Sequence, residues 1–517
     1  MEVVSLRARS GLAVVACLSL GGQLAAQSTP QVPPTLHDQL NAWFRRAARV
    51  APGEWGVAIA DERGQLLWGV NPTQPLIPAS TVKLFTTGFA RTVLGAEARQ
   101  VTRVVGTGYV YPVDGTWVGT WALELNGDPT LERPSRQGPT LRDLALQLAV
   151  HGIRRLPGPL VVQTAAGSVD PSYPTAWSPK HRGRSFAPLI GALTLNENLI
   201  SFTLAPGAKV GHAPRLVGSS PDGLGSLVTI KARTVQGRRD RLRVLAAGSG
   251  RYEVQGTIGV RARPRYFTAT AQNLQVVLEA AWEAALARAG IEWLRGEGIG
   301  ASSGSHGQLT LAEVVSPPLD SIAAEVNSRS LNIGAEALLR WAGGGGGGGG
   351  GGDSNDAARQ LTQHVLQVTG ELDGVYLVDG SGLSADDRAT AYSFVKYLAR
   401  FPSTPGGRNF PLLLPANGNG TLWRLGNSRL SPGVVRAKTG TLGNVSSLVG
   451  YLGHRDGLLL VSVLYNGGRV YAAKQQQWQL FRVLGAQGNA VPGDSAANDG
   501  QALGGESREP PGNPNDD

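Results

Sequence analysis

Apolar residues recur at helical spacing in a short segment that Pro78 precedes and Gly95 follows. Four of them lie three or four positions apart: Val82, Phe85, Phe89 and Val93. This spacing predicts a buried helix that begins within the stretch PASTVKLFTT. Ser80 therefore lies at the N-terminus of the helix, and Lys83 lies almost one turn further on the same face.

The hydrophobic pattern differs between the ends of the chain and its centre. Outside the centre, two helical segments and two pairs of strands are predicted, at residues 35–50, 319–342, 54–71 and 446–466. From about residue 100 to 300, short β-rich segments alternate with Gly, Pro and Asn, and one helical stretch covers residues 270–290. The centre therefore has the character of one or two smaller inserted domains.

The first 26 residues have the order of a secretory signal sequence. Arg7 and Arg9 precede an apolar run over residues 12–20, and small residues follow it. The run is too short for a stable membrane anchor, and no segment of the mature chain has transmembrane length. An alternative is lipid anchoring at Cys17, whose preceding residues resemble a lipoprotein box. Plain export is favoured because the apolar run continues past this cysteine.

The mature chain is predicted to contain one interrupted domain and one insertion. A peptidase-like domain is expected in two segments, residues 27–100 and 301–487, around inserted smaller domains at residues 101–300. Ten consecutive glycines, residues 343–352, predict a flexible surface loop. Residues 488–517 are poor in large apolar side chains and predict a disordered tail.

Composition limits the chemistry more than it identifies a partner. The 517 residues are 41% hydrophobic, and 48 basic against 38 acidic residues give a net charge of +10. This balance suits anionic surroundings without choosing among them. The densest basic stretch, which begins at Lys231, alternates like a strand and favours a solvated face over a binding patch. Cys17 is the only cysteine, so the mature chain has no disulfide, thiol nucleophile or thiolate metal site.

Three short motifs carry residue types that suit acyl transfer. Ser80 and Lys83 are three positions apart, and Ser330 and Asn332 are two apart at the beginning of a helix. Residues 438–441 read Lys-Thr-Gly-Thr between an apolar strand and a hairpin. Their order along the chain is that of the SxxK, SxN and KTG motifs of penicillin-binding proteins and serine β-lactamases. Each motif alone is common, whereas the ordered set in suitable helix and strand contexts is a strong indication.

The serine–x–x–lysine spacing occurs a second time, at Ser393 and Lys396. This pair does not fit the motif order because Ser330 precedes it, so we interpret it as a coincidence of helical sequence. None of the seven histidines forms an HExxH pattern or pairs with a serine motif. A Ser-His-Asp site therefore has little support, and no metal or organic cofactor is implied.

The first two motifs account for activation of a serine. A serine hydroxyl is a poor nucleophile until a neighbouring group takes its proton. Lys83 can do so if burial and a second cation, Lys438, lower its pKa, whereas an arginine keeps its proton. Ser330 is placed to carry a proton towards a leaving amine, and Asn332 to orient Lys83 or the substrate amide.

The third motif accounts for recognition of a peptide with a free carboxylate. Lys438 would attract the carboxylate, and the hydroxyls of Thr439 and Thr441 would donate hydrogen bonds to it. Gly440 has no side chain, so an extended peptide can lie against the strand edge. Together the motifs predict acyl transfer from a peptide that ends in a carboxylate.

The sequence resembles class C low-molecular-mass penicillin-binding proteins, the D-alanyl-D-alanine carboxypeptidase/endopeptidase group of peptidase family S13. The long insertion between Ser80 and Ser330 is a mark of this class that ordinary serine β-lactamases lack. Six further segments carry the resemblance: NGDPTL from Asn126, GALTLNENLISFTLAPG from Gly191, VVSPPLDSIAAEVNSRSLNIGAEALLR from Val314, VDGSGLS from Val378, LPANGNGTL from Leu414 and VRAKTGTLGNVSSLVGYL from Val435.

The resemblance implies an α+β fold. It consists of a serine β-lactamase/transpeptidase-like domain, with an antiparallel sheet flanked by helices and a helical subdomain, interrupted by inserted β-rich domains. It implies Ser80 as the acylated nucleophile, Lys83 as base, and backbone N–H groups of Ser80 and Thr441 as the oxyanion hole. Ser330 and Asn332 form the second motif, and Lys438, Thr439 and Gly440 the third.

The predicted function is that of a bacterial envelope serine D,D-peptidase. It acts on peptidoglycan stem peptides as carboxypeptidase, endopeptidase or both, and β-lactams acylate Ser80 as mimics of the peptide. The predicted location is the periplasm or another extracytoplasmic part of the envelope, without a nucleic-acid partner; oligomeric state is not predicted. A serine β-lactamase and a non-catalytic wall-binding protein are the alternatives.

Overall fold

The computed structural model describes Val491 and residues 35–133, 138–164, 169–296, 307–344, 354–427 and 430–485. The predicted signal sequence with Cys17, most of the glycine run, and the predicted tail apart from Val491 lie outside these residues. Within the described part of the chain, no helix combines the length and the apolar character needed to cross a bilayer.

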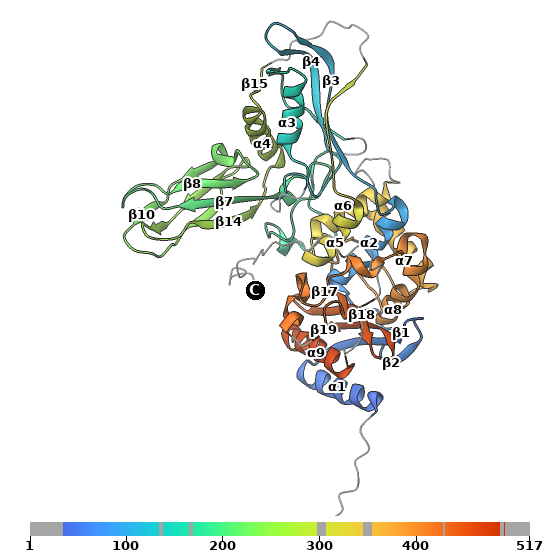
Figure 1. Ribbon diagram of the computed structural model, residues 1–517. Helices are drawn as coiled ribbons and strands as arrows, with labels where there is room; N and C mark the ends of the chain where they lie inside the picture. Colours follow the sequence, from blue (N-terminus) through green and yellow to red (C-terminus); the bar gives the residue numbers. More distant parts are fainter. Residues whose placement is uncertain are drawn as a thin grey trace, which may run out of the picture.

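A five-stranded antiparallel sheet joins segments from the two ends of the chain (Figure 1). Its order is β17-β18-β19-β1-β2. The strands are β1 (Glu54–Asp61), β2 (Leu66–Val70), β17 (Val435–Leu442), β18 (Val445–His454) and β19 (Gly457–Asn466). β1 pairs with β19 along its whole length. The complete sheet therefore forms only when the N-terminal and C-terminal segments of the chain come together. β17, which carries the Lys-Thr-Gly-Thr motif, is an edge strand.

Helices lie on both faces of this sheet, as Figure 1 shows. One face is covered by α1 (Leu36–Val50) and α9 (Val470–Val483), which contact each other. The other face carries the larger group: α2 (Val82–Leu94), α5 (Leu319–Arg329), α6 (Asn332–Gly343), α7 (Ser354–Thr369) and α8 (Ala391–Arg400). The antiparallel sheet and its flanking helices make the fold α+β, as the family resemblance implies.

Two local departures from the predicted helices shape the site. The apolar stripe of α2 is buried at Val82, Phe85 and Phe89, but Val93 is exposed because the last turn of the helix reaches solvent. The helical stretch predicted over residues 319–342 divides at Ser330, whose φ of +58° is left-handed. A residue in this conformation ends a right-handed helix.

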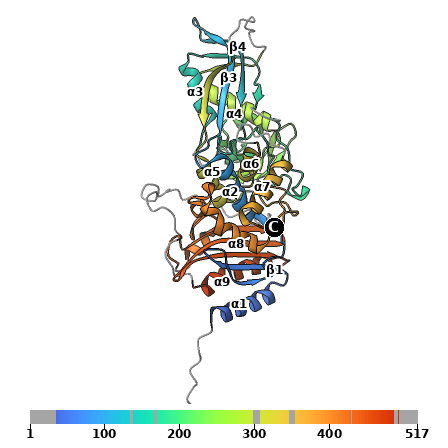
Figure 2. The ribbon, with the colours of Figure 1, turned by 90° about the vertical axis from the view of Figure 1, so that its right-hand side faces the viewer.

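The region between α2 and α5 builds a second sheet with two helices against it. Its order is β15-β5-β4-β3-β16, and β6 pairs with β4. The elements are β3 (Val101–Tyr111), β4 (Thr116–Glu124), β5 (Arg155–Pro157), β6 (Val162–Gln163), β15 (Glu292–Leu294), β16 (Leu309–Val315), α3 (Leu141–Val150) and α4 (Leu274–Arg288). Figure 2 shows β3 and β4 standing above the helices, at the far end from α1. β16 lies beyond residue 301 yet pairs with β3.

A group of short strands projects sideways from the molecule in Figure 1. We call residues 199–270 the wing. Its strands are β7 (Leu199–Ala205), β8 (Arg215–Ser220), β9 (Val228–Ile230), β10 (Arg233–Val235), β11 (Arg243–Ala246), β12 (Tyr252–Gln255), β13 (Thr257–Gly259) and β14 (Arg265–Thr270). A small core of its own supports it: Leu204, Ala232, Leu242, Val254 and Ile258.

Candidate active site

Ser80 and Lys83 lie where a 3₁₀ turn, η1 (Ala79–Thr81), leads into α2. The Lys83 side chain is fully buried. Its Nζ atom is 3.0 Å from Ser80 Oγ, 2.6 Å from Asn332 Oδ1 and 2.5 Å from the Ser381 carbonyl oxygen. Asn332 Oδ1 and the Ser381 carbonyl oxygen hold the amine in place beside the Ser80 hydroxyl. An amine held in this way can take the hydroxyl proton whenever it is unprotonated.

Burial is the main influence on the Lys83 amine. It lowers the Lys83 pKa to about 8, while the charges of Asp379, Glu336 and Asp387 act in the opposite direction. The sequence reasoning expected the Lys438 cation to contribute to this lowering. The pKa of Lys438 is itself lowered well below its usual value, by burial first and then by the charges of Lys83 and Lys474, and this repulsion between the two lysines is mutual.

Ser330 and Lys438 form a second hydrogen-bonded pair. Lys438 is fully buried, and its Nζ donates to Ser330 Oγ at 2.9 Å and to the Thr439 carbonyl oxygen at 2.7 Å. Ser330 occupies the left-handed residue between α5 and α6, and α6 begins at Asn332. The break between the two helices therefore presents Ser330 to Lys438 and Asn332 to Lys83.

The strand β17 runs close beside the turn that carries Ser80. A Cβ atom added at Gly440 would meet Ser447 Oγ at 2.1 Å, the Pro78 carbonyl oxygen at 2.9 Å and the Ser80 nitrogen at 3.0 Å. Ser447 Oγ donates to that same Pro78 carbonyl at 2.6 Å. Thr439 is 8% exposed, whereas Thr441 is exposed beyond Gly440. Seven of the eight predicted site residues thus fall within two adjoining clusters, and Thr441 follows them on β17.

Gly440→Ala is expected to lower the acylation rate by about 10²-fold, because a methyl group there must push β17 away from Ser80. Gly443→Ala is the matched control in the loop that follows β17, since an added Cβ at Gly443 meets nothing within 4 Å. Stopped-flow labelling with a fluorescent penicillin measures both variants. Equal rates for the two alanine variants would contradict the close approach of β17 to Ser80.

A loop that the sequence reasoning did not select completes the surroundings of Lys83. Asp379 accepts backbone N–H bonds from Ser381 at 2.9 Å and Gly382 at 2.5 Å on one oxygen, and from Ser384 at 2.8 Å on the other. The loop thereby aims the Ser381 carbonyl at Lys83. Gly382, with φ +75°, lies against the Ala79 carbonyl, where an added Cβ would be 2.0 Å away. The segment VDGSGLS was a visible signal for this loop, but not for its contact with Lys83.

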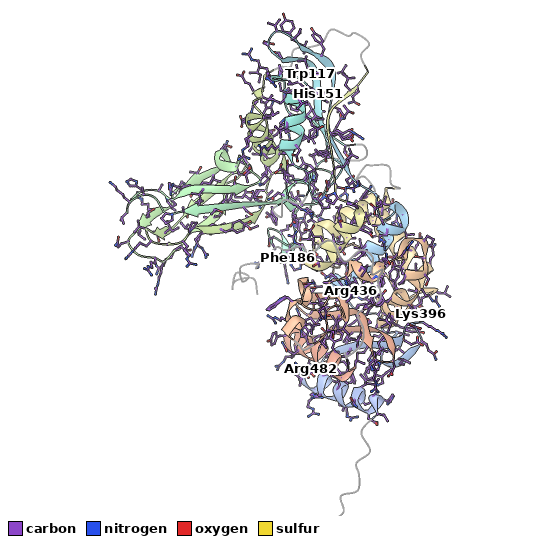
Figure 3. The ribbon with its side chains drawn as sticks, viewed as in Figure 1. Trp117, His151, Phe186, Lys396, Arg436 and Arg482 are labelled. Atoms are coloured by element: carbon purple, nitrogen blue, oxygen red, sulfur yellow. The ribbon has the colours of Figure 1, made fainter. Side chains whose placement is uncertain are left out.

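Two residues of the region between α2 and α5, which we call the central region, form hydrogen bonds with this site. Trp177 Nε1 donates to Asp379 at 3.0 Å, and Asn332 Nδ2 donates to the Phe186 carbonyl oxygen at 2.8 Å. Figure 3 labels Phe186 at the boundary between the central region and the body that carries β17. The central region therefore supports both Asn332 and the loop that faces Lys83.

The same region also binds Arg329, the residue before Ser330. Glu197 accepts two hydrogen bonds from Arg329, at 2.6 and 3.0 Å. Glu197 lies between Asn196 and Asn198, and all three residues have left-handed backbones, with φ between +50° and +58°. Such backbone is held only when its surroundings fix it. Here the side-chain amides of Asn196 and Asn198 donate to nearby carbonyl groups and hold Glu197 in place.

Trp177→Phe is expected to reduce the free energy of unfolding by about 1.5–3 kcal/mol more than Trp282→Phe, because only the former removes a hydrogen bond to a carboxylate. Both tryptophans are almost completely buried, so the loss of ring volume is similar. The indole N–H of Trp282 has no hydrogen-bond partner among the described residues. Urea unfolding of the two variants measures the difference, and equal losses would mean that the Trp177–Asp379 bond contributes nothing.

The second serine–x–x–lysine pair has an ordinary structural explanation. Ser393 and Thr390 form a capping box at the start of α8, with Ser393 Oγ donating to the Thr390 carbonyl at 2.8 Å. Lys396 pairs with Glu371 at 3.3 Å. The interpretation of this pair as a coincidence of helical sequence is confirmed.

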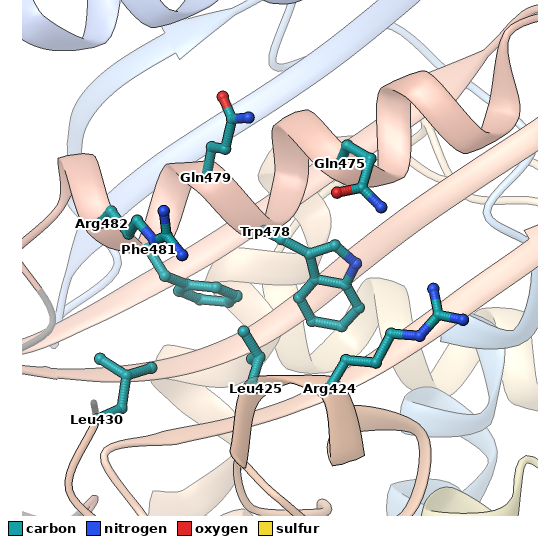
Figure 4. Close-up of a pocket in the computed structure, with 8 residues that line it drawn as sticks. All are labelled: Arg424, Leu425, Leu430, Gln475, Trp478, Gln479, Phe481 and Arg482. Carbon is teal, nitrogen blue, oxygen red and sulfur yellow. The ribbon is translucent and has the colours of Figure 1, made fainter. Parts of the chain in front are cut away.

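A cavity of about 310 Å³ lies apart from these clusters, between α9 and the 3₁₀ segment η8 (Gly420–Asn427), as Figure 4 shows. None of the predicted site residues lines it. Its lining consists of Arg424, Leu425, Leu430, Gln475, Trp478, Gln479, Phe481 and Arg482. Over the described ranges, no group of three or more His, Cys, Asp or Glu side chains is arranged to hold a metal ion.

Known proteins are similar to this chain in sequence and in fold. The chain is 27% identical over 431 residues to the D-alanyl-D-alanine carboxypeptidase of Actinomadura sp. strain R39, covering 80% of this chain and 77% of that one. It is 24% identical over 417 residues to the D-alanyl-D-alanine carboxypeptidase DacB of Haemophilus influenzae, covering 78% and 83%.

The crystal structure of penicillin-binding protein 4 (dacB) from Haemophilus influenzae superposes with a TM-score of 0.66 at 19% identity. The match covers 84% of this chain and 98% of that one, and it shows the shared fold. A family model for the D-Ala-D-Ala carboxypeptidase 3 (S13) family matches residues 36–485. The chain therefore belongs to the D-Ala-D-Ala carboxypeptidase 3 (S13) family.

Proposed function

We propose that the protein is a serine D-alanyl-D-alanine carboxypeptidase, endopeptidase or both, which acts on peptidoglycan stem peptides through an acyl-enzyme at Ser80. The observation that carries the proposal is the contact of Lys83 Nζ with both Ser80 Oγ and Asn332 Oδ1. These three residues come from two motifs 249 positions apart, in a chain of the S13 family.

Acylation uses the two hydrogen-bonded clusters in sequence. The Ser80 hydroxyl oxygen bonds to the carbonyl carbon of the penultimate D-alanine, and its proton passes to Lys83 Nζ. The C–N bond to the terminal residue then breaks, and the proton held by Lys83 passes through Ser330 to the leaving nitrogen. A water molecule afterwards attacks the ester carbonyl carbon. Its hydroxyl group stays on the shortened peptide, and its other proton passes by way of Lys83 to the departing Ser80 oxygen. Asn332 holds Lys83 in place during both steps.

Substrate recognition is assigned to the edge of β17. An extended peptide lies along this edge, and its carboxylate contacts Lys438 with the hydroxyls of Thr439 and Thr441. A bound carboxylate raises the lowered pKa of Lys438 again, because an opposite charge favours the protonated amine. The N–H groups of Ser80 and Thr441 form the oxyanion hole, and Gly440 allows β17 to approach the Ser80 turn closely enough to bring them together.

β-Lactams are proposed as acylating inhibitors of Ser80. A structure of the Haemophilus influenzae relative in complex with a β-lactam, at TM-score 0.62 and 20% identity, supports this proposal. The protein is further proposed to be exported to the periplasm or another extracytoplasmic part of the envelope, with residues 1–26 as a signal sequence. Lipid anchoring at Cys17 is the less favoured alternative.

The proposed domain division follows the two sheets. A peptidase domain is formed by residues 27–100 and by the chain from α5 to residue 487, and the inserted part extends from residue 101 through β16. Pairing of β16 with β3 supports including β16 in the inserted part.

Two reactions followed in parallel test the proposed function. The purified protein is incubated with a muropeptide pentapeptide and, separately, with penicillin, and the release of D-alanine and of hydrolysed penicillin is measured. Release of D-alanine with slow loss of the penicillin adduct is expected. Rapid penicillin hydrolysis without D-alanine release would assign a β-lactamase instead, and absence of both reactions would favour a non-catalytic wall-binding protein.

A further inference from the structure

The wing contains almost all of the net charge of the protein. Residues 199–270 include twelve Lys and Arg against three Asp and Glu, which is +9 of the total +10. All twelve basic side chains are exposed: Lys209, Arg215, Lys231, Arg233, Arg238, Arg239, Arg241, Arg243, Arg251, Arg261, Arg263 and Arg265. The remainder of the chain is therefore nearly neutral, and the positive charge is concentrated on one projecting part.

The acidic residues of the wing do not neutralise this surface. Glu253 pairs with Lys231 at 2.5 Å and Asp240 with Arg265 at 3.2 Å, while Asp222 pairs with Arg288 outside the wing. In the part of the chain that the structure describes, the other ten basic side chains of the wing have no carboxylate partner. Ten cations thus face solvent without a partner of opposite charge.

Several of these arginines are fixed close together by backbone pairing. The N–H of Arg241 donates to the Thr257 carbonyl at 2.7 Å, Gly259 donates to the Arg239 carbonyl at 2.8 Å, and Arg261 donates to the Gly237 carbonyl at 3.0 Å. These bonds lie beside β10 and β13, and Figure 1 shows β10 at the outer end of the wing. We call Arg238, Arg239, Arg241 and Arg261 the tip arginines.

We propose that the tip arginines bind carboxylate groups of the peptidoglycan polymer, away from the bond that Ser80 attacks; this inference rests on the proposed function. Guanidinium groups match carboxylates with two parallel hydrogen bonds. The wing projects away from β17 (Figure 1), the strand that lies beside the Ser80 turn, so only an extended, polymeric substrate reaches both places. A solvated strand face, which the sequence favoured, does not require that so much charge be gathered on one projection.

The wing is less suited to a lipid surface. All of its residues are described, and it contains β-strands and one short 3₁₀ turn but no α-helix. Proteins that lie in the membrane interface usually insert the apolar face of an amphipathic helix. The expected ligand of the wing is therefore the peptidoglycan polymer, and vesicles of anionic phospholipid test the alternative of lipid binding.

A charge-neutralised variant tests the proposal against a matched control. The wing variant changes all four tip arginines to glutamine. The control changes four other exposed arginines, which belong to α1 and to the turn between β1 and β2, to glutamine and alters the net charge equally: Arg45, Arg46, Arg49 and Arg63. Binding to purified peptidoglycan sacculi is measured by co-sedimentation at low and high salt, beside D-alanine release from a soluble pentapeptide.

The wing variant is expected to bind sacculi at least tenfold more weakly than the parent at low salt, while the control binds like the parent. Added salt should weaken the parent's binding more than that of the wing variant. All proteins should release D-alanine from the pentapeptide at the same rate. Equal sacculus binding by the wing variant and the parent, or salt-insensitive binding by the parent, would overturn the proposal.

Two other outcomes distinguish a failure of the proposed wing–carboxylate contact from a failure of the proposed peptidase function. If the wing variant loses binding to vesicles of anionic phospholipid but keeps binding to sacculi, the wing recognises lipid and the proposal is wrong. If the parent binds sacculi through the wing but releases no D-alanine from the pentapeptide, the proposed function fails while the carboxylate-binding surface remains.

Discussion

Ser80→Ala is expected to lower D-alanine release and covalent penicillin labelling by about 10⁴-fold or more, because among the described residues only Ser80 brings a hydroxyl against Lys83 Nζ. Lys83 would keep its contacts with Asn332 and the Ser381 carbonyl, so the fold should persist. Labelling is quantified by gel fluorescence, and turnover by enzymatic detection of D-alanine. Retention of either activity at more than a few per cent would contradict the assignment of Ser80.

Ser393→Ala is the matched control for this experiment, because Ser393 also precedes a lysine by three residues. The substitution removes buried hydrogen bonds of the capping box at the start of α8, which costs about 1 kcal/mol of stability. Labelling per folded molecule should remain at the parent level. A similar loss in both variants would point to general damage rather than to removal of a nucleophile.

Acylation at saturating substrate should rise with pH and level off above about pH 8, because Lys83 acts in its unprotonated form and burial lowers its pKa to about 8. Below that value the reactive fraction falls about tenfold with each pH unit. Lys83→Met should remove this dependence and lower the rate by roughly 10²–10⁴-fold. Stopped-flow acylation from pH 6 to 9.5 measures both effects.

The pH experiment separates Lys83 from Lys438. The pKa of Lys438 is also lowered, but its proposed contact is with the substrate carboxylate, so its loss of charge should weaken apparent affinity rather than the saturated rate. Lys83→Arg offers a further comparison, since a guanidinium keeps the charge but cannot act as base. A pH-independent rate in the parent, or the same rise in Lys83→Met, would remove Lys83 from the proposed role.

The residues that the sequence could identify were those whose chemistry shows in short motifs. Ser80 and Lys83 share a helix face, and the order of the three motifs along the chain indicated one site. In the structure, hydrogen bonds from Lys83 to Asn332 and from Lys438 to Ser330 connect the three motifs. The sheet pairing of β18 with β19 was also visible, because strong apolar strands flank a short turn.

What the sequence could not supply were contacts made by residues without a distinctive local pattern. Asp379 and Trp177 are 202 positions apart, and nothing in either segment indicates that they meet. The sequence placed Ser330 and Asn332 at the beginning of a helix, and α6 does begin at Asn332. It did not indicate that the backbone of Ser330 is left-handed, because the residues on both sides have helical patterns. The pKa of Lys83 depends on burial and on three carboxyl groups, two of which lie in the loop after Val378.

The most direct test of the account is to map the site of acylation in the unmodified protein. The mature chain is incubated with penicillin, its intact mass is measured, and the adduct is located by proteolysis and tandem mass spectrometry. A single penicilloyl group on Ser80 is expected. An adduct on any other residue, or no adduct on a folded protein that still releases D-alanine, would contradict it.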